Sequence, residues 1–272
     1  VATNTDATLP TERGFALGNG SLVAAVANAT GEDYLAAGKP FPDIYRRALA
    51  RAGIDIEEVD EAGPVRTWHV FPGRPSPGDT DIEPDLSNAG PFLAAAMVTG
   101  GRVRVPGWPR ATSQPGDAWR AILGHMGARV ELGDDGLTVE GPGAGNYPGI
   151  DADMSAVGEL TPALAAICAS ASRLSGIAHL RGHETDRVAA LATELNRLGG
   201  DAQDGGDCLA ITPAPLRPGT VETYEDHRMA AFGAVLGLTT AGVGVRDIEC
   251  TSKTLPGFAR MWAGALAGRR EP

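Results

Sequence analysis

The sequence predicts an α/β protein whose larger domain contains three repeated units, with the helices buried inside and the sheets facing solvent. Three stretches each show a helix, a strand, a loop and a second helix, and they recur at intervals of about 70 residues. The first helix of each stretch, as at 92–98 and 164–171, is rich in alanine and almost free of charge. Such a helix is expected to be buried on all sides, so the units should pack around their first helices.

The first unit begins with the sequence Glu83-Pro84-Asp85-Leu86-Ser87-Asn88. Apolar periodicity and turn residues then predict alternating helices and strands. The predicted elements are a helix at 91–98, a strand at 102–105, a helix at 117–126 and strands at 128–132 and 136–139.

The second unit begins with Gly158-Glu159-Leu160-Thr161-Pro162. Its clearest helix has apolar residues at helical spacing and ends at Gly199-Gly200; the apolar residues are Val188, Leu191, Leu195 and Leu198. The predicted elements are a helix at 163–171, a strand at 172–177, a helix at 186–198 and strands at 201–203 and 208–211.

The third unit begins with Tyr224-Glu225-Asp226-His227-Arg228 and continues as a helix to about residue 238. A strand at 242–248 and a final helix at 256–266 follow.

We therefore predict a C-terminal domain of three units over 82–272 and a divergent remnant of a second, similar domain over 1–81. Within the remnant we expect a helix at 43–52 and strands at 54–58 and 67–71.

Composition excludes several classes of function. The net charge of −11 argues against binding of nucleic acids or anionic membranes, which require basic surfaces. No apolar run approaches the roughly 20 residues of a membrane span, and nothing near Val1 resembles a signal peptide. Cys168, Cys208 and Cys250 form no C-x-x-C pair, which argues against a zinc site or a disulfide framework. We expect reduced thiols in a cytoplasmic protein.

The segment 180–187 carries the densest group of candidate site residues. It is a loop that enters a helix, where free amide groups and the helix dipole favour anions. Arg187 can donate two hydrogen bonds to a phosphate or carboxylate, while His183 and Glu184 are candidates for general acid–base work. Helix capping by Thr185 and Asp186 is the structural alternative.

Three further segments place charged residues at predicted helix starts. Asp226, His227 and Arg228 precede one helix, Lys253 precedes the last helix, and Glu159 precedes the helix at 163–171. Each could be an ordinary capped or solvated helix end. If the three units share one axis, however, their helix starts lie on one side, and these residues gather around a single cleft. One anion site then explains the four segments better than four independent caps.

Together these motifs resemble those of the EPSP synthase family of enolpyruvyl transferases. The resemblance rests on E-T-D-R at 184–187, Y-E-D-H-R-M-A at 224–230 and T-S-K-T-L-P at 251–256, and it extends from about residue 53 to 265. It implies a domain of the enolpyruvyl-transferase type and the transfer of enolpyruvate from phosphoenolpyruvate to the 5-hydroxyl of shikimate-3-phosphate, a reaction expected to use neither metal nor cofactor. Those two compounds are the implied partners, and the full-length enzyme is expected to be a monomer.

The resemblance also implies roles for individual residues. Arg187, Arg228 and Lys253 would bind phosphoenolpyruvate, and Glu184 would exchange a proton with its methylene carbon. Glu159 would accept the proton of the 5-hydroxyl. Asp226 and His227 would line the cleft wall, and His183 stands where many members of the family have lysine.

The first 45 residues depart from the family pattern. A Ser-Ser-Gln triplet that binds shikimate-3-phosphate should lie near 19–21, where this chain has Asn19-Gly20-Ser21, and the segment 38–43 is shortened. We therefore expect negligible turnover from this chain alone. Two alternatives remain open at this point: a degenerate, non-catalytic homologue that binds an anionic metabolite or a partner, and a structural repeat domain without a site.

Overall fold

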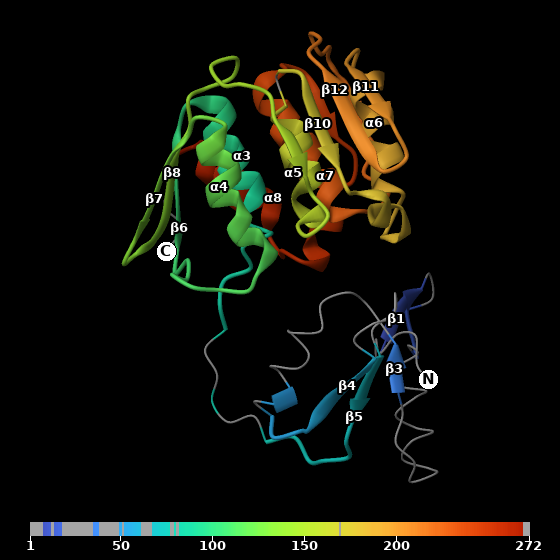
Figure 1. Cartoon of the computed structure of the whole chain (residues 1–272). Coiled ribbons are helices and arrows are strands. Elements are labelled where there is room, and N and C mark those ends of the chain that lie inside the picture. The colour runs from blue at the N-terminus through green and yellow to red at the C-terminus, as the bar shows by residue number, and fades with distance from the viewer. Residues whose placement is uncertain are drawn as a thin grey trace. The chain divides into compact units, whose positions relative to one another are not determined.

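The computed structural model describes residues 8–11, 14–17, 35–37, 49–50, 52–60, 67–76, 79, 82–168 and 170–268. The chain divides into two compact units, Val1–Ile82 and Glu83–Pro272 (Figure 1). None of the helices described is long and apolar enough to cross a membrane.

The N-terminal unit contains two small antiparallel sheets. Strands β1 (Thr8–Thr11) and β2 (Gly14–Leu17) form a hairpin, while β3 (Leu35–Ala37), β5 (Thr67–Val70) and β4 (Ile56–Asp60) form a three-stranded sheet in that order. The last two strands match those expected near 54–58 and 67–71. Most of the helix expected at 43–52 lies outside the described residues, as do the altered segments 19–21 and 38–43.

The C-terminal unit is organised around three inner helices. They are α3 (Gly90–Thr99), α5 (Thr161–Ala166) and α7 (His227–Thr239), the first helices of the three repeats. All three pack on one another, and their small side chains allow the close approach. Leu93, Leu164 and Phe232 have no exposed surface. The predicted α/β fold of three repeated units with buried first helices is confirmed.

Three separate sheets cover the inner helices. The first, in the order β6-β8-β7, is antiparallel; the second has the order β11-β12-β10-β9; the third pairs β13 with β14 in parallel. Alternation between half-buried and exposed residues along β6 and β7 shows that the outer face meets solvent. The strands are β6 (Arg102–Pro106), β7 (Arg129–Gly133), β8 (Gly136–Glu140), β9 (Asp151–Asp153), β10 (Ser172–Ser175), β11 (Asp201–Asp204), β12 (Cys208–Thr212), β13 (Gly219–Val221) and β14 (Val243–Val245).

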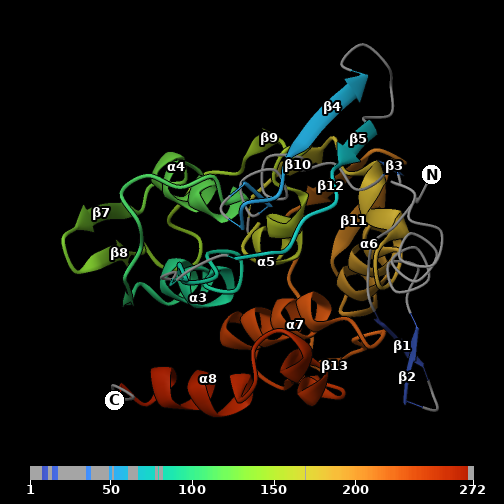
Figure 2. The same cartoon turned by 90° about the horizontal axis from the view of Figure 1, so that it is seen from below.

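The outer helices complete the unit. Helix α4 (Trp119–His125) follows the 3₁₀ turn η1 (Pro115–Ala118), and α6 (Arg187–Arg197) covers the sheet of the second repeat. Helix α8 (Phe258–Leu266) lies at the periphery of the unit (Figure 2). Its residues Phe258 and Trp262 pack on Phe92 of α3.

Several predicted elements were wrong in extent. The helix expected at 163–171 ends at Ala166, and the last helix begins at Phe258 after Gly257 in the left-handed region (φ 79°). The strand β9 was missed because Asp-Ala-Asp carries little strand propensity of its own, and β13 because Gly-Thr-Val is only three residues long. Pairing with β10 and β14 makes them strands. Three loops contain 3₁₀ turns: η2 (Gly158–Leu160), η3 (Ala178–Gly182) and η4 (Ile248–Lys253).

Asp186 rather than Thr185 is the N-cap of α6. Its carboxylate accepts a hydrogen bond from the Ala189 amide at 3.0 Å and also pairs with Arg181. We expect Asp186→Ala to lower the free energy of unfolding by about 1–2 kcal/mol, because the cap and the ion pair are both lost. Asp186→Asn keeps a good cap and should lose less than about half of that. Urea unfolding of the two variants tests this, and an equal loss in both would assign the effect to the ion pair instead.

Candidate active site

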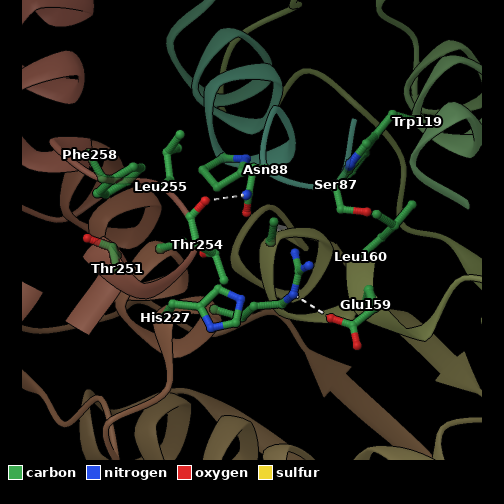
Figure 3. A pocket seen from close by; sticks show the side chains of 14 residues that line it. Ser87, Asn88, Trp119, Glu159, Leu160, His227, Thr251, Thr254, Leu255 and Phe258 are labelled. Carbon is green, nitrogen blue, oxygen red and sulfur yellow. Dashed lines mark hydrogen bonds and ion pairs between the residues drawn. The ribbon is translucent and has the colours of Figure 1, made fainter. Parts of the chain in front are cut away.

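Glu159, just before α5, joins three of the candidate residues. Its carboxylate lies 2.5 Å from Arg228 Nε (Figure 3). It also lies 3.1 Å from Arg187 Nη1 and 3.3 Å from His183 Nδ1. Burial opposes ionisation of Glu159, but the charges of Arg228 and Arg187 outweigh it and hold its pKa below the usual value. Glu159 is therefore a carboxylate at neutral pH.

Glu184 contacts two further candidates, His227 and Lys253, and also lies near Arg187. One oxygen lies 2.9 Å from His227 Nδ1, the other lies 2.5 Å from Lys253 Nζ, and Arg187 Nη2 is 4.0 Å away. Burial raises the pKa of Glu184, but hydrogen bonds from His227 and Lys253 more than reverse this and lower it to about 2. These two partners therefore keep the carboxylate ionised.

Arg187 and Asp226 form the buried base of the site. Asp226 has no exposed surface, and the Arg187 side chain is only 2% exposed. Arg187 Nε donates to Asp226 Oδ2 at 2.7 Å, and Nη2 lies 3.3 Å from Oδ1. Asp226 also caps α7 by accepting the Arg228 amide at 2.8 Å. The pair thus ties the start of α6 to the start of α7.

The structure brings all eight candidate residues into one connected network. They come from four separate segments, so local helix capping does not explain the convergence. Three cations and three carboxylates balance in charge, with two histidines between them; the eight are Glu159, His183, Glu184, Arg187, Asp226, His227, Arg228 and Lys253.

The three cations differ in how far a ligand can reach them. The Lys253 side chain is 52% exposed, Arg228 is 15% exposed, and Arg187 lies beneath Glu159 and Asp226. An anion from solvent therefore meets Lys253 and Arg228 first. Arg187, whose side chain is only 2% exposed, is the least accessible of the three.

A pocket opens beside this network at the starts of the three inner helices. Asn88 lines it and donates its side-chain N–H to the Thr254 carbonyl, just after η4, at 3.2 Å (Figure 3). We did not predict the six residues below as site residues from the sequence, although the E-P-D-L-S-N motif contains two of them. The polar and aromatic lining residues besides the network are Ser87, Asn88, Trp119, Thr251, Thr254 and Phe258.

One group of side chains within the described residues could offer atoms to a metal ion. Ligand atoms of Glu184, Asp226 and His227 lie within 4.8 Å of one another. Both carboxylates already pair with cations, Glu184 with Lys253 and Asp226 with Arg187. A metal ion would have to displace these cations, so the donor set fits ion pairing better than metal binding.

The low pKa of Glu184 predicts a pH-dependent contribution to stability. A lowered pKa means that the stabilisation is present above the ordinary value of 4.5 and is lost as pH falls toward about 2. Because the group is partly exposed, we expect only about 1–2 kcal/mol at neutral pH. Glu184→Gln should therefore be less stable than the wild type at pH 7 and nearly equal to it at the lowest pH that permits folding. Urea unfolding at several pH values tests this, and a difference that does not change with pH would contradict it.

Comparison with known proteins identifies the family. A sequence profile of the EPSP synthase (3-phosphoshikimate 1-carboxyvinyltransferase) family matches residues 17–262. The 3-phosphoshikimate 1-carboxyvinyltransferase of Kocuria rhizophila is 54% identical over 227 residues, which cover 82% of this chain and 50% of that protein. This chain thus spans about half the length of that curated relative.

Solved structures agree on the fold. The EPSP synthase of Acinetobacter baumannii superposes with a TM-score of 0.67 at 21% identity, covering 86% of this chain and 56% of that one. The enolpyruvyl transferase NikO of Streptomyces tendae gives a TM-score of 0.56 at 21% identity, covering 85% and 55%. The resemblance inferred from the motifs is confirmed: this chain belongs to the EPSP synthase family.

Proposed function

We propose that this chain carries the phosphoenolpyruvate-binding and proton-transfer groups of an enzyme that transfers enolpyruvate to the 5-hydroxyl of shikimate-3-phosphate. The observation that carries the proposal is the position of Glu184, ionised and hydrogen-bonded to both His227 and Lys253. A carboxylate in this setting sits beside cations that can bind an anionic substrate and can itself exchange a proton.

Phosphoenolpyruvate presents two anionic groups, a phosphate and a carboxylate. Lys253 and Arg228 are the cations that solvent reaches, and Arg228 lies in the first turn of α7, where the helix dipole adds positive potential. Arg187 stands behind them and would be uncovered if Glu159 turned toward the second substrate. The three residues together suit a ligand with two charged ends.

Binding of this anion would change the protonation of Glu184. In the unliganded chain, Lys253 lowers the pKa of the carboxyl group. A phosphate or carboxylate that engages Lys253 takes away that interaction and adds negative charge nearby, and both effects raise the pKa. Glu184 then becomes a group that can hold a proton and donate it to the methylene carbon of the enol.

Glu159 suits the opposite role. Its pKa is lowered by Arg228 and Arg187, so it is ionised and can accept the proton of the 5-hydroxyl as that oxygen bonds to the substituted carbon of phosphoenolpyruvate. The protonated methylene becomes a methyl group in a tetrahedral intermediate. Loss of a methyl proton and of phosphate then restores the carbon–carbon double bond and gives the enol ether product.

The two alternatives have less support. A site-free repeat domain does not explain the convergence of eight ionisable residues from four segments. A degenerate homologue is not favoured by the 54% identity to a named transferase.

We also propose that the whole enzyme is a cytoplasmic monomer. The cytoplasm suits the three free cysteines, two of which are buried.

Calorimetric titration of the chain with phosphoenolpyruvate tests the proposal. Inorganic phosphate and pyruvate serve as controls, because each carries only one of the two anionic groups. We expect phosphoenolpyruvate to bind more tightly than either control, with affinity that falls as salt increases. Equal affinity for phosphate and phosphoenolpyruvate, or no binding heat, would contradict a site built for both groups.

A further inference from the structure

Glu194 is a fully buried carboxylate that belongs to none of the interactions described above. It lies in α6 with no exposed surface, and both of its oxygens are hydrogen-bonded. Tyr224 donates its hydroxyl hydrogen to Oε1 at 2.6 Å, and the Glu222 amide donates to Oε2 at 3.0 Å. Arg197 lies 3.2 Å from Oε1 at the solvent side. A buried charge is costly, so these partners indicate a site built to hold it.

The segment that Glu194 binds has an unusual backbone. Tyr224 and Glu225 have φ angles of 54° and 57°, two consecutive non-glycine residues in the left-handed region. Such residues are strained and persist only where the surroundings enforce them. The strained pair directly precedes Asp226, His227 and Arg228. A change in these two residues would therefore move the start of α7.

Helix α6 holds this segment at two points. Arg187 and Glu194 are seven residues apart, which is about two helical turns and places them on one face of α6. Arg187 binds Asp226 after the strained pair, and Glu194 binds Glu222 and Tyr224 before and within it. The two attachments together enclose the left-handed turn.

We propose that Glu194 and Tyr224 are positioning residues that hold the left-handed turn and thereby set the orientation of Asp226, His227 and Arg228. The contribution of these two residues to catalysis depends on the function proposed above. Neither residue needs to touch a substrate. Losing the Tyr224 hydroxyl would let the turn relax. The two hydrogen bonds between Arg187 and Asp226 would then lengthen, and Arg228 would no longer face the pocket.

Tyr224→Phe tests the proposal with little risk to folding, because the tyrosine is 38% exposed and the ring is kept. We expect the Nε–H resonance of Arg187, which reports its bond to Asp226, to shift or broaden in NMR spectra. We also expect phosphoenolpyruvate to bind about tenfold more weakly. Glu194→Gln should reproduce both effects. Glutamine has an NH2 group in place of one of the two oxygens that accept hydrogen bonds from the Tyr224 hydroxyl and the Glu222 amide. The double variant should be no worse than the worse single variant.

Tyr147→Phe is the matched control. The Tyr147 hydroxyl is buried without a hydrogen-bond partner among the described residues, and it lies by the opposite ends of the inner helices. This variant should leave both the Arg187 resonance and phosphoenolpyruvate binding unchanged. An unchanged Arg187 resonance in Tyr224→Phe, even with a lowered melting temperature, would reduce Tyr224 to a structural role and overturn the proposal. If the wild type binds no phosphoenolpyruvate, the proposed function fails, but the Arg187 resonance still decides whether these residues position the turn.

Discussion

Replacing Arg187 by methionine should lower the free energy of unfolding by about 3–5 kcal/mol, a large part of the stability of a typical domain. Methionine has a similar length but leaves the carboxylate of Asp226 buried without a countercharge. Glu159 would lose one of its cations as well. Urea unfolding followed by the fluorescence of the tryptophans in the C-terminal unit measures the change.

The double variant Arg187→Met with Asp226→Asn separates the two contributions. Asparagine is a good N-cap and carries no charge, so it removes the uncompensated carboxylate without removing the cap of α7. We expect the double variant to recover most of the lost stability. A single variant that loses less than about 1 kcal/mol would contradict the view that Arg187 neutralises a buried charge.

Replacing Arg228 by alanine should weaken phosphoenolpyruvate binding by about 1–3 kcal/mol, or roughly 5- to 150-fold in Kd. Arg228 is one of the two cations that an incoming anion reaches, and alanine removes its charged hydrogen bonds. The fold should tolerate the change, because Glu159 keeps Arg187 as a partner. Calorimetric titration of both proteins measures the difference.

Arg129→Ala is the control for this experiment. Arg129 pairs with Glu131 on the exposed face of β7, so its removal changes the net charge equally without touching the site. We expect wild-type affinity from this variant. Equal binding by the wild type and Arg228→Ala would contradict the assignment of Arg228.

The sequence predicted the inner helices and the convergence of the motifs for physical reasons. Helices such as α3 and α7 must be buried on all sides because nearly every residue in them is apolar or small. The strand β9 could not be predicted in this way, since Asp-Ala-Asp becomes a strand only through its parallel pairing with β10. Its structure depends on a long-range contact that no local pattern records.

Dependence on long-range contacts also limited what the sequence could predict about the site. Motif chemistry identified Glu184, Arg187 and Lys253, because charged residues at helix starts invite an anion. It did not show that Arg187 lies beneath Glu159 and Asp226, or that Glu194 binds Tyr224. Those facts depend on how α6 packs against the segment before α7, which spacing along the chain does not reveal.

The most direct test of this account is the pKa of the Glu184 carboxyl group with and without phosphoenolpyruvate, measured by ¹³C NMR on glutamate-labelled protein. Without ligand, Lys253 and His227 hold that pKa near 2. We expect saturating phosphoenolpyruvate to draw Lys253 away and raise this pKa, and inorganic phosphate to raise it less. An unchanged Glu184 pKa at saturation would contradict the claim that this carboxylate becomes the proton donor when the anion binds.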